Sequence, residues 1–170
     1  MSEDPVIDVR AFAKSGGSLA GTVAITRFAR LSDFLAEDSG SIAYGIAGRL
    51  DGDGNPRLRV DVSGRLTLRC QRCLGSVLHA VESHRELRFV PDASLLPEVA
   101  DEVPDVDVLL TPPDLHVLDW VEDEILLGLP ISPRHEAGGC RPPVNPAAAN
   151  AVVNPFAALG GLESPHTKDR

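Results

Sequence analysis

The sequence of 170 residues predicts an α+β fold, a single domain dominated by an antiparallel sheet with one or two helices. Three observations lead to this prediction. Residues 57–70 alternate between polar and apolar side chains, which is the period of a strand with one buried face. Residues 77–89 resume the alternation, and the apolar residues between 118 and 129 recur at helical spacing. At 43% hydrophobic, the chain has enough apolar side chains for a core.

The N-terminal segment is expected to form two short strands and a helix. Residues 6–12 are rich in apolar side chains and precede the turn residues Ser15-Gly16-Gly17, so they are predicted to form a strand. Residues 18–25 are the second predicted strand. Residues 26–35 are predicted to form a short amphipathic helix, because their apolar side chains have its spacing, at Phe28, Leu31, Phe34 and Leu35.

An antiparallel meander is predicted for residues 42–90. A strand ending at Leu50 is followed by the turn residues 51–56, the alternating strand 57–70 and the strand 77–89, with Cys70–Gly75 at the hairpin tip. Alternate residues of a strand face the same side of a sheet, so one row of arginines is expected on the solvated face. This predicted arginine stripe consists of Arg57, Arg59, Arg65 and Arg69.

The net charge of −9 is concentrated in one segment. Eleven acids lie between Asp92 and Glu124, and no Lys or Arg interrupts them. Residues 91–113 show little periodicity, so we expect an acidic loop there. An acidic chain with only five Phe, one Trp and one Tyr is a poor candidate for nonspecific nucleic-acid binding through stacked bases.

The predicted helix after the loop begins near Asp114 or Asp119, either of which is a suitable N-cap, and runs to Leu129. Pro, Gly, Ala and Asn dominate the remainder of the chain. We therefore expect residues 1–135 to form the domain and residues 136–170 to form a flexible tail, with a short apolar motif at residues 154–159.

Two cysteines at the hairpin tip, Cys70 and Cys73, have the spacing of a zinc knuckle. His135 and Cys140 are the obvious second pair, and a structural zinc ion on all four residues is one interpretation. A second interpretation is that Cys70 packs in the core and the other cysteines are ordinary thiols. A third, a thioredoxin-like redox pair, requires a helix N-terminus that a hairpin does not provide.

No arrangement of residues indicates catalysis. The sequence contains no Ser-His-Asp pattern, P-loop or glycine-rich dinucleotide turn, so we expect neither an enzyme nor a small-molecule substrate. No run of residues is long and apolar enough for a membrane span, and the acidic start lacks the features of a secretory signal. With an odd number of cysteines, the sequence predicts a cytoplasmic protein with reduced thiols.

Several blocks of the chain, in this order, resemble the bacterial YceD family of large ribosomal RNA subunit accumulation proteins. They are residues 66–74 around Cys-Gln-Arg-Cys, an acidic segment, residues 121–135 around Asp-Glu-Ile-Leu-Leu-Gly-Leu-Pro, Cys140, and residues 154–159. The resemblance covers most of the chain and is loose over residues 1–40. It implies a cytoplasmic role in the accumulation or processing of 23S ribosomal RNA, and it implies no known catalytic residue. Cys70, Cys73, His135 and Cys140 match positions of the family's motifs.

Two mechanisms remain open for such a role. In the first, the protein binds precursor ribosomal RNA or a ribonucleoprotein, with phosphate contacts from Arg57, Arg59, Arg65, Arg69 and Arg72. In the second, it is an adaptor whose acidic segment and C-terminal apolar motif bind a basic ribosomal protein or a processing enzyme.

Overall fold

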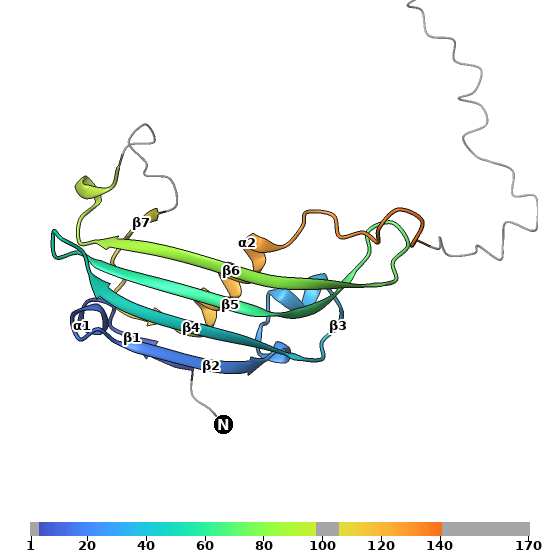
Figure 1. Ribbon diagram of the computed structural model, residues 1–170, viewed down its shortest axis with the longest axis horizontal. Coiled ribbons are helices and arrows are strands. Elements are labelled where there is room, and N and C mark those ends of the chain that lie inside the picture. Colours follow the sequence, from blue (N-terminus) through green and yellow to red (C-terminus); the bar gives the residue numbers. More distant parts are fainter. Residues whose placement is uncertain (1–3, 98–105, 141–170) are drawn as a thin grey trace, which may run out of the picture.

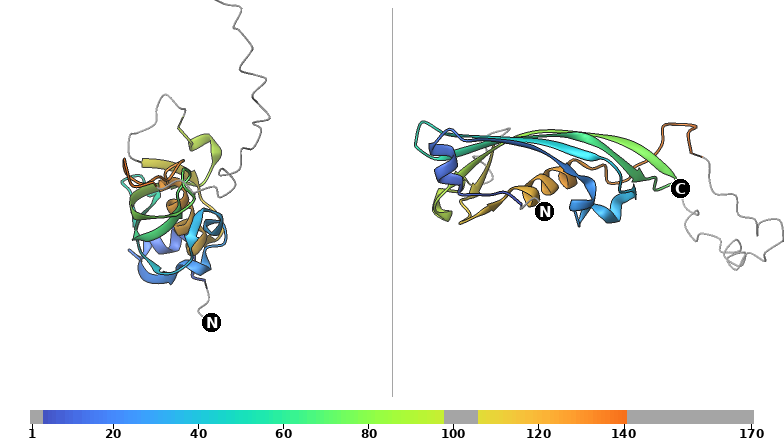
Figure 2. Two further views of the ribbon diagram at one scale, coloured as in Figure 1. Left: turned by 90° about the vertical axis from the view of Figure 1, so that its right-hand side faces the viewer. Right: turned by 90° about the horizontal axis from the view of Figure 1, so that it is seen from below.

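The computed structural model describes residues 4–97 and 106–140. A long, curved sheet carries the helices on one of its faces (Figure 1 and Figure 2). The strands are β1 (Val6–Ile7), β2 (Ser18–Ala24), β3 (Leu35–Glu37), β4 (Ser41–Leu50), β5 (Pro56–Arg69), β6 (Ser76–Val90), β7 (Val106–Leu110) and β8 (Leu115–His116). The α-helices of the described part are α1 (Val9–Lys14) and α2 (Val117–Gly128). The predicted α+β fold, dominated by an antiparallel sheet, is confirmed.

The main sheet has the strand order β2-β4-β5-β6-β7, and β3 pairs with the hairpin end of β5 beyond β4. Its pairs are antiparallel except β6 with β7, which run parallel. The long β5–β6 hairpin is in continuous register from Arg57↔Arg88 to Arg69↔Ser76. This hairpin therefore spans the length of the molecule, with its turn at one end and β7 at the other (Figure 1).

The alternation in β5 divides core from solvent as its sequence predicts. The even-numbered apolar residues, such as Leu58, Val60 and Leu66, are fully buried, whereas Arg59, Arg65 and Arg69 are exposed. Burial of each such aliphatic side chain is worth about 1.5–3 kcal/mol relative to its exposure. The hydrophobic effect thus sets the register, since a slip of one residue would move the whole apolar row into water.

Helix α2 packs its apolar stripe against the inner face of the sheet. Val117, Val121 and Ile125 are fully buried at the i, i+4, i+8 spacing of one helix face, and Trp120 lies beside them. The predicted helix is confirmed, but neither Asp114 nor Asp119 caps it. Instead, the Val117 N–H donates to the Pro5 carbonyl at 3.0 Å, so the residue before β1 satisfies one of the helix's free N–H groups.

Two predictions for the N-terminal segment are wrong. Residues 6–12 form the two-residue strand β1 followed by α1, because the Asp8 side chain accepts a hydrogen bond from the Ala11 N–H and caps a helix. Residues 26–35 do not form an α-helix. They contribute to the short 3₁₀ turns Ile25–Arg27 and Leu31–Phe34 and to the start of β3.

The predicted acidic loop 91–113 is also partly wrong. It includes a 3₁₀ turn, Ala93–Leu95, and strand β7, which extends the sheet by parallel pairing with Glu86–Val90. Residues 98–105 and most of the predicted tail, with the motif at 154–159, lie outside the described residues. Among the residues described, no helix has the length and apolar character needed to cross a membrane.

Candidate metal centre

The turn between β5 and β6 aims two sulfurs at one point. Cys70 follows directly on β5, and its N–H donates to the Gly75 carbonyl at 2.8 Å. The Leu74 N–H donates back to the Cys70 carbonyl at 2.9 Å, and Leu74 adopts a left-handed conformation with φ of 61°. This tight turn brings Cys73 back beside Cys70, as a knuckle requires.

The other half of the site comes from the segment after α2. The Gln71 N–H donates to the Pro133 carbonyl at 2.9 Å, which joins this segment to the hairpin turn. Gly138 has a φ of +86°, a conformation that favours glycine, and the Gly139 N–H donates to the Glu136 carbonyl. The resulting turn carries the chain back so that Cys140 lies beside His135.

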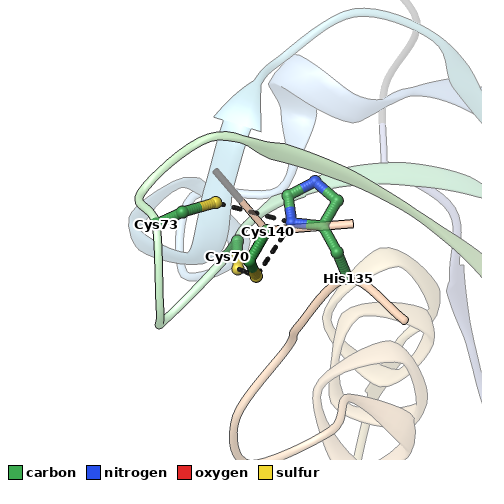
Figure 3. Close-up of side chains that lie close together, drawn as sticks. All are labelled: Cys70, Cys73, His135 and Cys140. Atoms are coloured by element: carbon green, nitrogen blue, oxygen red, sulfur yellow. Dashed lines mark hydrogen bonds between the residues drawn. The ribbon is translucent and has the colours of Figure 1, made fainter. Parts of the chain in front are cut away.

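The four predicted ligands, Cys70, Cys73, His135 and Cys140, lie together, and their ligand atoms are all within 4.8 Å of one another. Figure 3 shows their side chains pointing toward a common centre. The Cys70 and Cys140 sulfurs are 3.6 Å apart, and His135 Nδ1 is 3.5 Å from the sulfurs of Cys73 and Cys140. A tetrahedral zinc ion, with bonds of about 2.3 Å to sulfur and about 2.0–2.1 Å to nitrogen, separates its ligand atoms by about 3.5–3.8 Å.

A backbone carbonyl orients the imidazole of His135. The Nε2–H group donates to the Ser76 carbonyl at 2.8 Å, so Nδ1 is left with its lone pair facing the sulfurs. A hydrogen bond of this kind to the outer nitrogen is the usual support for a metal-binding histidine. Ser76 thus belongs to the site through its backbone, which makes its contribution invisible in the sequence.

Electrostatics favour a thiolate at the centre of the cluster. Burial raises the pKa of the Cys70 thiol, but N–H groups of Cys73, Arg72 and His135 stabilise its anion and bring the pKa down to about 5. Burial and the contact with the Cys70 sulfur raise the pKa of Cys140. The hydrogen bond to Ser76, and after it the contact with Cys70, raise the pKa of His135. At neutral pH, the Cys70 thiol is therefore deprotonated and supplies an anionic ligand to the cluster.

This donor set fits a metal ion. Three thiols and one imidazole are a common ligand set of structural zinc, and with four protein ligands no position remains for water or substrate. Cys70 is fully buried, as a core cysteine would be, but its sulfur lies beside the other three ligand atoms. The Cys70–Cys73 pair lies in a hairpin turn, not at the helix N-terminus of a thioredoxin-like pair.

The structure divides the predicted arginine stripe into two parts. At the end far from the cysteines, Arg57 Nη1 lies 3.2 Å from Glu86, and Arg59 Nη2 lies 2.9 Å from Asp61. Near the cysteines, no described carboxylate lies within 4.0 Å of the guanidinium groups of Arg65, Arg69 or Arg72, and all three side chains are exposed. RNA binding by these residues stays a prediction.

Further residues near the metal centre were missing from the predicted set. Arg134, next to His135, is exposed and donates from Nε to the Ser132 hydroxyl at 3.1 Å. Leu74 and Leu78, on the hairpin, are also exposed, at 65% and 67%. Arg134 could have been predicted from the sequence, because it is next to the predicted ligand His135. The exposure of the two leucines could not, because it follows from the fold.

One comparison with known proteins finds a match. The family model described as "Large ribosomal RNA subunit accumulation protein YceD" matches residues 58–163. The matched region contains the β5–β6 hairpin, α2 and all four residues of the candidate metal centre. No curated protein and no solved structure matches the chain.

Proposed function

The chain belongs to the YceD family of large ribosomal RNA subunit accumulation proteins, and from this premise we propose that it is a non-enzymatic, cytoplasmic factor that binds precursor 23S ribosomal RNA. The observation that carries the RNA contact is the group of three arginines without carboxylate partners, within the described residues, beside the candidate metal centre. We call Arg65, Arg69 and Arg72 the hairpin arginines. Their guanidinium groups are free to bind phosphate.

The hairpin arginines suit the RNA backbone better than the bases. Arg65 and Arg69 point to the same side of β5, roughly 13 Å apart at about 3.3 Å per residue, and Arg72 lies in the turn that follows. Guanidinium groups bind phosphate oxygens in a bidentate way, and such contacts position a protein without reading sequence. With aromatic side chains so scarce, a stacking platform for bases is not part of this proposal.

A structural zinc ion is the second part of the proposal. Cys70, Cys73, His135 and Cys140 would hold it, and it would neutralise the thiolates and cross-link the hairpin turn to the segment after α2. This cross-link fixes Arg72, which lies between two of the ligands in sequence. It also fixes Arg134, which adjoins a third, so the ion would order the proposed RNA surface without taking part in a reaction.

The RNA contact is tested by titrating a precursor 23S ribosomal RNA fragment at several salt concentrations. Replacement of all three hairpin arginines by Gln should weaken binding and make the slope of log K against log salt less negative by about 2 to 3. The matched control replaces Arg57 and Arg59, which already have carboxylate partners, and should leave the slope nearly unchanged. An equal loss of RNA affinity in both variants, or binding that does not depend on salt concentration, would contradict the proposal.

The zinc ion is tested separately by metal analysis of the purified chain. We expect one zinc per chain, lost in Cys73→Ser and His135→Asn and retained in His79→Asn, whose histidine lies outside the cluster. If the wild-type chain contains no metal, the three cysteines are ordinary thiols and the zinc proposal is wrong. The RNA titration is a separate measurement with its own controls, so each part of the proposal can fail while the other holds.

A further inference from the structure

A groove lies between β7 and α2, at the end of the sheet opposite to the metal centre. It consists of two adjoining cavities of about 460 Å³ and about 420 Å³. The two cavities share the lining residues Leu87, Leu109, Trp120 and Asp123. Each volume is within the range of roughly 300–1,000 Å³ that is typical of ligand sites. We call this the Trp120 groove.

The Trp120 groove exposes apolar side chains that the described residues do not cover. Leu109, Leu110 and Leu127 are exposed at 45%, 47% and 70%, although the groove's floor residue Trp120 is only 6% exposed. The indole Nε1–H of Trp120 has no hydrogen-bond acceptor among the described residues. Exposed leucines that cluster around a buried aromatic side chain are typical of an interaction surface.

The carboxylates around the groove favour a partner with basic side chains. Four carboxylates contribute to the lining, and no Lys or Arg does so among its described residues; the acids are Asp107, Asp119, Asp123 and Glu124. Arg85 lies 3.1 Å from Asp107 and 3.5 Å from Glu124. Arg30 pairs with Asp123, but the Asp119 carboxylate pairs with no cation in the described part of the chain. An acidic rim on an apolar groove repels RNA and attracts a basic apolar segment.

We propose that the Trp120 groove binds a basic amphipathic segment of a protein partner. Its leucine or isoleucine side chains would cover Leu109, Leu127 and the Trp120 ring, and its lysines or arginines would face the acidic rim, Asp119 first. The groove lies beside Glu86–Val90, and Glu86 is roughly 33 Å along β6 from Ser76 at about 3.3 Å per residue. Such a protein partner and an RNA at the hairpin arginines therefore fit on one molecule at the same time.

Trp120 is the only tryptophan of the chain, so its fluorescence reports directly on the groove. The probe is a synthetic 14-residue peptide of Leu and Lys at helical spacing, without tryptophan, added to the full chain. We expect a saturable change in Trp120 emission with this peptide. We expect none with the twin peptide that carries Glu in place of Lys, or with an isomer whose Leu and Lys positions are scrambled.

Matched variants separate the groove from general charge attraction. Leu127→Ser and Asp119→Asn should each weaken peptide binding about tenfold. Leu78→Ser, at a leucine of nearly equal exposure on the opposite face of the sheet, and Glu82→Gln, at an exposed acid, should leave it unchanged. Leu127, Leu78 and Glu82 are each at least two-thirds exposed, and Asp119 is also exposed. Circular dichroism checks that each variant folds.

Four outcomes would overturn the proposal. The first is an unchanged Trp120 emission up to millimolar peptide, and the second is equal weakening by the groove variants and their controls. A shift of Trp120 emission in Phe156→Ser without peptide would instead assign the groove to the chain's own motif at residues 154–159. A dimer that Leu127→Ser dissociates in sedimentation would assign it to a second copy. None of these results bears on the RNA titration of the hairpin arginines.

Discussion

The carboxylate of Glu122 holds together parts of the chain about ninety residues apart. It is buried, at 5% exposure, and accepts hydrogen bonds from the N–H groups of Arg30 at 2.7 Å and Leu31 at 3.0 Å. The Arg30 guanidinium adds a third bond at 2.9 Å. Glu122→Ala would leave two N–H groups without an acceptor and would remove one of the two carboxylates that pair with Arg30, so we expect a loss of about 2–4 kcal/mol in the free energy of unfolding.

Urea denaturation of Glu122→Ala measures this loss, and Asp123→Ala is its control. Asp123 also pairs with Arg30, but its side chain is 53% exposed, and an exposed pair is worth about 0–1 kcal/mol. Equal destabilisation by the two substitutions would show that the buried N–H groups do not depend on Glu122.

His84 and Asp61 form a pH-sensitive pair on the solvated face of the sheet. Their Nδ1 and Oδ1 atoms are 2.6 Å apart. The hydrogen bond with Asp61 raises the pKa of His84, and the same bond lowers the pKa of Asp61. The histidine's contribution to stability is therefore full below its ordinary pKa of 6.5 and is lost as the pH rises through the raised value. The carboxylate's contribution is present above 3.8 and is lost as the pH falls through its lowered value.

An NMR titration of the imidazole signals measures this pair. We expect the pKa of His84 above 6.5 in the wild-type chain and lower in Asp61→Asn, where Glu82 is the carboxylate that still raises it. Arg59→Gln removes the other partner of Asp61 but leaves its carboxylate in contact with His84, so the pKa of His84 should stay raised. A value that is the same with and without Asp61 would contradict the assignment.

The candidate site was predictable where its chemistry lies in rare side chains. Cys70, Cys73 and Cys140 are the chain's only cysteines, and the spacing of the first two indicates a knuckle. The carbonyl of Ser76 was not predictable, because every residue has one. The ion pair of Arg57 was also hidden, since the alternation of β5 shows which face a side chain takes but not that Glu86 reaches it from β6.

At the scale of elements, the packing of α1 on β4 depends on a glycine. A Cβ atom at Gly48 would lie 2.7 Å from the Phe12 ring and 3.0 Å from the Cα atom of Ala13. Gly48→Ala would push the helix away from the strand, so we expect a loss of about 1–3 kcal/mol of stability. At Gly45, on the same strand, a Cβ would meet no described atom within 4 Å.

Thermal unfolding of the two alanine variants measures this difference. Gly45→Ala should be neutral or stabilising by up to about 1 kcal/mol, since alanine restricts the unfolded chain more than glycine does. A Gly48→Ala variant as stable as Gly45→Ala would mean that α1 tolerates a shift of its position at no cost.

Among the helices and strands, some could be predicted from the sequence and others could not. Strand β5 and helix α2 were predictable, because each keeps one period over enough residues to bury a continuous face. Residues 26–35 have helical spacing but form 3₁₀ turns, and the carboxylate that binds Arg30 and Leu31 comes from a helix far away in sequence. Strand β7 is short and lies in an acidic segment, and only its parallel pairing with β6 defines it.

At the scale of the whole molecule, charge is separated along the sheet. The hairpin arginines lie at the turn of the β5–β6 hairpin, and the acidic Trp120 groove lies where β7 joins β6. The net charge of −9 therefore describes neither surface. In the two proposals, an RNA would therefore contact one end of the molecule and a basic peptide the other.

Removal of the metal should loosen one end of the molecule and leave the rest intact. The proposed zinc joins residues 70–75 to residues 132–140, whereas the core between α2 and the sheet is built from apolar side chains away from the cluster, such as Val60, Ile42 and Ile125. After chelation we therefore expect amide hydrogen exchange to accelerate in those two segments, while the central residues of β4 and β5 keep their protection.

The exchange experiment compares the chain with and without chelator, and His135→Asn should reproduce the chelated pattern without any chelator. His79→Asn, which leaves the cluster complete, should respond to the chelator as the wild-type chain does. Global loss of protection would mean that the metal is required for the whole fold, as in small zinc domains. Unchanged exchange at the hairpin turn would mean that the hydrogen bond from Gln71 to Pro133 already holds the two segments together, and the proposed zinc would then have no ordering role at the RNA surface.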